Sequence, residues 1–180
     1  MKRSMVLLAA AAALAFGQDK AAETPVKNVE LTVYLLSGVG AGADDVPQDL
    51  ASTVKQLHSL FSYKSYKLSE SFILRGRSGT GNQYAQTEGV LPGSGLHYVF
   101  GYTRVRLSAE KPYMVHIDRL HISLTTDLGY GRDGKALART VASINTDLDL
   151  ADGQKTVVGK SSINSAGDAL ILVIVPKVIE

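Results

Sequence analysis

The chain contains neither cysteine nor tryptophan, and only 4 of its 180 residues are phenylalanine. Without cysteine, the protein has no disulfide, no thiol nucleophile and no cysteine–metal site. The fold must therefore be held together by the packing of its apolar side chains alone.

The sequence also lacks an excess of charge of either sign. It has 19 Lys and Arg residues against 17 Asp and Glu, and two of the basic residues, Lys2 and Arg3, stand at the extreme N-terminus. The remaining charges balance and are scattered, whereas nucleic-acid binding proteins concentrate basic residues on one face. We expect no nucleic-acid partner.

The N-terminus has the pattern of a secretory signal peptide. Lys2 and Arg3 precede an apolar block at residues 5–16, and the small residues Ala15 and Gly17 stand before Gln18. The block is shorter than the roughly 20 residues that a transmembrane helix needs. We therefore predict a signal peptide at residues 1–17, a flexible lead-in at 18–28, no transmembrane helix, and a protein exported to the periplasm or associated with the outer membrane.

The most informative stretch is the uninterrupted apolar run at residues 169–175, which Pro176 ends. A strand with one solvated face needs apolar residues only at alternate positions, so this run predicts a strand covered on both faces. Its cover comes either from the chain's own core or from a partner or second copy. The candidate assembly residues are Leu170, Ile171, Leu172, Val173, Ile174 and Val175.

Alternating and helical patterns place the other elements. Strands are predicted at residues 29–35, 66–75 and 83–91, the last near a sheet edge, and as an antiparallel pair at 96–107 and 113–125. A change in the apolar phase near Asp118 and Arg119 indicates a β-bulge. A helix is predicted at 47–60, a loop at 127–135, and a hairpin around Asp152-Gly153 that joins 144–150 to 154–160.

This element order predicts an α+β fold with a β-α-β opening, one main helix and a following antiparallel β meander. Residues 29–180 are expected to form a single domain. A division into a β-α-β module at 29–78 and a β module at 83–180 is the alternative.

No motif predicts a catalytic, cofactor or metal site. The stretch at residues 38–43 fits a dinucleotide-binding glycine pattern, but two aspartates follow where the pyrophosphate would lie. The stretch at 153–161 resembles a phosphate-binding loop with one residue too many. His116, Asp118 and His121 do not share a strand face unless the bulge intervenes, so we expect no metal there.

The last third of the chain resembles the closing part of the secretin family of outer-membrane channels. The resemblance is carried by Ile-Asn-Thr-Asp-Leu at 144–148, Leu-Ala-Asp-Gly-Gln-Lys-Thr-Val-Val-Gly-Lys at 150–160, and Leu-Ile-Leu-Val-Ile-Val-Pro at 170–176. It implies a secretin-like or secretin-associated envelope protein.

The sequence thus favours a non-enzymatic exported protein of the cell envelope that works by β-mediated assembly, either self-association or binding to a protein partner. A periplasmic small-ligand binding module is the alternative, and a hydrolase would need a distant Ser-His-Asp grouping. The candidate ligand face comprises Tyr98, Tyr102, Arg104, Tyr113 and His116.

Overall fold

The computed structural model describes residues 26–79, 81, 83–131, 134–164 and 167–179. The predicted signal peptide and most of the predicted lead-in lie outside the described residues. Within them, no helix combines the length and the apolar character that crossing a bilayer requires.

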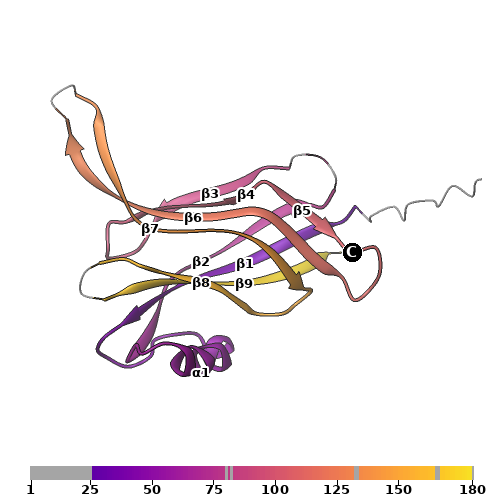
Figure 1. The fold of residues 1–180 in the computed structure, drawn as a ribbon, viewed down its shortest axis with the longest axis horizontal. Coiled ribbons are helices and arrows are strands. Elements are labelled where there is room, and N and C mark those ends of the chain that lie inside the picture. The colour runs from indigo at the N-terminus through magenta and orange to yellow at the C-terminus, as the bar shows by residue number, and fades with distance from the viewer. Residues whose placement is uncertain (1–25, 80, 82, 132–133, 165–166, 180) are drawn as a thin grey trace, which may run out of the picture.

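Two antiparallel sheets face one another as a sandwich (Figure 1). The first sheet has the strand order β2-β1-β9-β8, with β1 at Asn28–Val39, β2 at Ser65–Arg77, β8 at Thr156–Ser162 and β9 at Ala169–Ile179. The second contains β3 (Ala85–Val90), β4 (His97–Tyr102), β5 (Arg104–Leu107), β6 (Met114–Tyr130) and β7 (Ala136–Ala151). In this second sheet β4 and β5 pair with successive parts of β6, and β7 also pairs with β6. The first and last described strands, β1 and β9, are therefore neighbours in one sheet.

The main core fills the space between the sheets. Alternate residues of β1, from Val29 to Leu35, point into it and meet inward residues of the second sheet such as Phe100 and Ile122. These side chains are almost fully withdrawn from solvent. The period-2 pattern seen in the sequence is therefore the pattern of a two-layer sandwich.

The apolar strand β9 is buried on both faces, as the sequence predicted. Leu170, Leu172 and Ile174 pack in the core between the sheets. Ile171 and Val173 face the other way, into a second cluster formed with the helix. Since β9 also lies between β1 and β8, this chain itself covers both faces of the strand at residues 169–174, while Val175 is partly exposed.

The helix lies on the outer face of the first sheet (Figure 1). A short 3-10 turn at Gln48–Leu50 leads into α1 at Ala51–Leu60, which confirms the helix predicted at 47–60. Leu50, Val54 and Leu57 occur at helical spacing and cover β9. The helix therefore covers the outward-facing apolar residues of β9.

The α+β assignment is wrong. Strands hold 63% of the described residues and helices 9%, so the protein is mostly β. The predicted β-α-β opening exists in sequence order, but β1 and β2 are antiparallel neighbours and α1 only connects them. The predicted helix is present. However, the strands extend through segments that lack a strong apolar pattern, and these extensions make the fold mostly β.

The predicted hairpin at Asp152-Gly153 is also wrong, although the turn itself is present. Gly153 has φ of 76°, a conformation that suits glycine. However, β7 belongs to the second sheet and β8 to the first, so the chain crosses between layers at this point. A turn signal shows where a chain changes direction but does not identify the strand that pairs next.

The predicted bulge is confirmed. The pairing of β6 with β7 shifts between Ile117 and Leu120, and Arg119 has φ of 51°. Further along, residues 127–130, part of the loop predicted at 127–135, instead continue β6 in its pairing with β7. We call residues 125–131 and 134–140 the arm, which projects beyond both sheets (Figure 1).

Two aspartates tie the helix region to the first sheet and should make stability depend on pH. A hydrogen bond from Lys155 holds the pKa of Asp49 below its ordinary value, Tyr34 adds to this, and partial burial opposes it. His58, by its hydrogen bond, likewise lowers the pKa of Asp44. A carboxyl group whose pKa is lower in the folded state than in the unfolded state stabilises the fold at pH values above its ordinary pKa of about 3.9.

We expect that stability to be lost as the pH falls from that range through the lowered folded-state pKa values. Urea denaturation followed by circular dichroism measures the free energy of unfolding between about pH 6 and about pH 3, the range in which this loss should appear. An Asp44→Asn/Asp49→Asn variant should be less stable at pH 6 and lose less on acidification. Equal acid sensitivity of the two proteins would contradict this assignment.

Candidate functional site

The five residues predicted as a ligand face do not lie together. Tyr98 and Tyr102 are buried in the core, with the Tyr98 ring stacked on Phe72 at 5.3 Å between centroids. Arg104 and His116 are partly exposed, and each contacts an aspartate of the second sheet, Asp118 and Asp149 respectively. Tyr113 lies before β6, within cation–π distance of lysine side chains.

The reason is a change of strand phase at Thr103. Even-numbered residues of β4 point inward, whereas in β5 the inward positions are Val105 and Leu107. Thr103 separates the two strands and donates its backbone N–H to the Asp118 carbonyl at the bulge. The sequence indicated one continuous strand here and so assigned Arg104 to the wrong side of the sheet.

Charged residues of the second sheet are paired across neighbouring strands. Asp118 accepts a hydrogen bond from Arg106 at 2.9 Å and lies 3.5 Å from Arg104, while His116 contacts Asp149. Among the described residues, no three potential metal-ligating side chains come together. These pairs fit a solvated sheet face.

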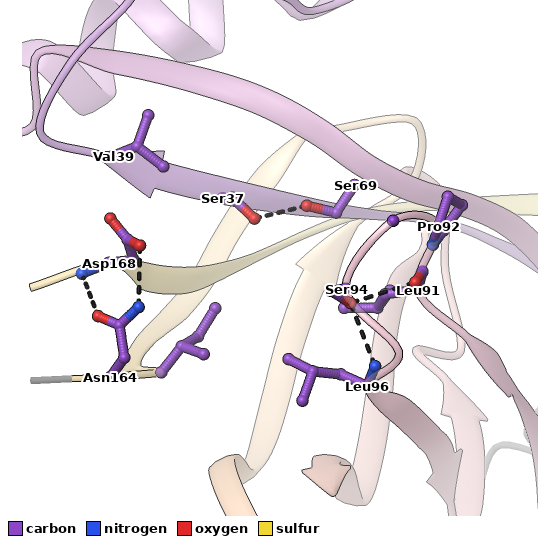
Figure 2. A pocket seen from close by; sticks show the side chains of 11 residues that line it. Ser37, Val39, Ser69, Leu91, Pro92, Ser94, Leu96, Asn164 and Asp168 are labelled. Atoms are coloured by element: carbon purple, nitrogen blue, oxygen red, sulfur yellow. Dashed lines mark hydrogen bonds between the residues drawn. The ribbon is translucent and has the colours of Figure 1, made fainter. Parts of the chain in front are cut away.

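A pocket of about 440 Å³ opens at one end of the sandwich, between segments far apart in the sequence (Figure 2). The end of β1 and the facing part of β2 contribute Ser37 and Ser69. The β3–β4 connection contributes residues 91–94 and 96, and the β8–β9 connection contributes Ile163, Asn164 and Asp168.

The pocket combines apolar walls with a few polar groups. The Ser37 and Ser69 hydroxyls lie 2.6 Å apart and hydrogen-bond to each other. Asp168 accepts a hydrogen bond from the Asn164 amide through one carboxylate oxygen and donates its backbone N–H to the Asn164 side-chain carbonyl. Apolar walls with a small number of placed polar groups are typical of small-molecule sites.

The arm is the second candidate site. Beyond Thr125, the last residue of β6 paired with β4, the arm is a two-stranded ribbon. Its side chains Leu128, Tyr130 and Leu137 are 56%, 80% and 47% exposed, and no described part of the chain covers them. Three large apolar side chains exposed on one short ribbon make the arm a candidate interaction surface.

A third feature is the open edge formed by β3. In the described chain β3 pairs only with β4, and Tyr84 and Val90 at its two ends are 64% and 50% exposed. Its one charged residue is Glu88, whereas the edge strand β2 carries Lys67, Glu70, Arg75 and Arg77. Charges protect sheet edges from pairing with other chains, so β3 is the less protected of the two.

Sequence reasoning missed both the pocket and the arm. The pocket residues have no local signal because they come from two strands and two connections that lie far apart in the sequence. The arm had one: Leu128, Tyr130 and Leu137 flank a glycine-containing segment, a pattern that also fits a hairpin. The candidate assembly residues of β9, by contrast, are buried at 170–174 and partly exposed only at Val175.

Comparisons with models of protein families, with curated proteins and with solved structures found no match to this chain.

Proposed function

We propose that this protein is a non-enzymatic, exported component of the bacterial cell envelope that assembles with copies of itself through β-strand pairing. The arm of one copy adds to the open β3 edge of the next. Export rests on the signal-peptide pattern, and a place beside secretin-type channels rests on the resemblance of residues 144–176. The observation that carries the assembly is the uncovered apolar arm.

The arm is poorly suited to remain alone in water. A two-stranded ribbon without further cover is marginally stable at best. Covering each of Leu128, Tyr130 and Leu137 would contribute about 1.5–3 kcal/mol at full burial. Since association also carries an entropic cost of roughly 4–15 kcal/mol, the expected interaction is weak for one contact and depends on concentration.

The β3 edge has the chemistry to receive the arm. It offers unpaired backbone groups along six residues, apolar side chains at Tyr84 and Val90, and the carboxylate of Glu88. The arm brings the guanidinium group of Arg139 close in sequence to its apolar residues. Backbone pairing, apolar contact and opposite charge therefore agree on one acceptor, a second copy of this chain.

Because donor and acceptor are different surfaces, the contact is heterologous. Repetition of such a contact produces either a closed ring or an open filament. A ring is the geometry that a channel-associated envelope component would use.

Complementary variants test the proposal. Leu128→Ser/Tyr130→Ser/Leu137→Ser removes the donor and leaves the acceptor, whereas Val90→Lys damages the acceptor and leaves the donor. In size-exclusion chromatography with light scattering, wild-type protein should form concentration-dependent oligomers and each variant alone should be monomeric. A mixture of the two variants should form a heterodimer that grows no further, because one good donor and one good acceptor remain.

The matched control is Ile73→Lys, which places a charge at a 56%-exposed apolar position on the other edge strand, β2. This variant should assemble like wild type. A wild-type protein that stays monomeric at every accessible concentration, or a mixture of variants with no heterodimer, would refute the proposal.

A further inference from the structure

We propose that the pocket at the end of the sandwich binds a small organic cation, a primary ammonium group carried on a short apolar body. The pocket is separate from the arm and from β3, so this inference is independent of the assembly. It rests on what the lining residues offer and on which of their polar groups are already used.

The first step concerns the negative charge. Asp168 lines the pocket, and its carboxylate accepts one hydrogen bond, from the neutral Asn164 amide. Within the described chain, no lysine, arginine or histidine lies close enough to Asp168 to form an ion pair. The pocket therefore presents a carboxylate with acceptor capacity to spare and no cation of its own.

The second step concerns the hydroxyl groups. Ser37 and Ser69 are bonded to each other at 2.6 Å, so one hydroxyl hydrogen serves that bond. Both oxygens retain lone pairs that can accept further hydrogen bonds. A primary ammonium group has three N–H donors, which suits a pocket whose lining holds one carboxylate and two hydroxyls.

The third step concerns the body of the ligand. The apolar part of the lining comes from Val39, Leu91, Pro92 and Leu96, which Figure 2 labels, and from Ile163. A volume of about 440 Å³ accommodates a short alkyl or single-ring body in addition to the head group. A strongly polar molecule such as a sugar would leave many of its hydroxyls facing these apolar walls, which is unfavourable.

Three probes with one body and different heads test this assignment: n-hexylamine, n-hexanol and hexanoate. Titration followed by NMR chemical shifts of the pocket residues should give the tightest binding for n-hexylamine, weaker binding for n-hexanol, and none for hexanoate. Asp168→Asn keeps a side-chain oxygen for Asn164, so the connection should retain its shape. Because the variant removes a charge-assisted contact, n-hexylamine binding should weaken about 10- to 100-fold.

Asp149→Asn is the control, since Asp149 pairs with His116 on the second sheet and does not line the pocket. It should leave n-hexylamine binding unchanged. Equal binding of n-hexylamine and n-hexanol, tighter binding of glucose than of n-hexylamine, full binding by Asp168→Asn, or no binding of any probe would each overturn the assignment. None of these outcomes would affect the assembly proposal, which depends on other residues.

Discussion

Replacing Leu172 with alanine is expected to lower the free energy of unfolding by about 2–5 kcal/mol. Leu172 lies in the middle of β9, fully buried in the core between the sheets. Alanine loses the transfer free energy of the removed atoms and leaves a cavity that the flanking strands, β1 and β8, cannot easily fill. For a domain whose total stability is of the order of 5–15 kcal/mol, this is a large fraction.

Urea denaturation followed by circular dichroism measures the change. Val173→Ala, on the opposite face of β9 beneath the helix, should also destabilise the protein, because the second cluster depends on it. Ile73→Ala is the control, since Ile73 is exposed on β2 and should change stability by less than about 0.5 kcal/mol. A Leu172→Ala effect no larger than that of Ile73→Ala would show that β9 is not enclosed.

The second large effect is expected at Gly76 in β2. A Cβ at this position would lie 2.0 Å from the Tyr102 hydroxyl oxygen, far inside contact distance. Tyr102 is 1% exposed and held among core side chains, so its ring cannot move aside freely. Gly76→Ala should therefore destabilise the protein by about 1–3 kcal/mol, the usual cost of overpacking a core.

A double-mutant cycle identifies the cause. Tyr102→Phe removes the hydroxyl that a Cβ at residue 76 would meet, so Gly76→Ala should cost less in the Tyr102→Phe background than in wild type. Gly81→Ala is the control, because among the described residues no part of the chain beyond its immediate neighbours lies within 4 Å of the position of an added Cβ. Equal costs of Gly76→Ala in both backgrounds would mean that the clash with Tyr102 is not the cause.

The sequence was most informative where a residue pattern left one physical solution. The run at residues 169–175 contains no polar residue, which predicts a strand covered on both faces, and β9 is such a strand. Leu50, Val54 and Leu57 predicted the helix by their spacing. The change of phase near Arg119 predicted a bulge, because an extra residue is what restores inward-facing positions.

The sequence was least informative about which strands pair. Asp152-Gly153 is an equally good turn whether the chain returns to the same sheet or crosses to the other. The sequence does not reveal the phase change at Thr103, because apolar residues stand at even positions before it (Tyr98, Tyr102) and at odd positions after it (Val105, Leu107) without any interruption of the strand pattern. The pocket was not predictable, because Ser37, Ser69 and Asp168 come from separate segments of the first sheet and the rest of the lining comes from the β3–β4 connection of the second.

Amide hydrogen exchange as a function of protein concentration tests the central claim most directly: that β9 is covered by its own chain and the arm makes the contacts between copies. We predict that β9 amides exchange slowly, through global unfolding, at every concentration. Arm amides at residues 126–130 and 136–140 should exchange rapidly in dilute protein and become protected as concentration rises. The account would be contradicted if the β9 amides exchanged rapidly in dilute protein and became protected as concentration rises, while the arm amides stayed unprotected.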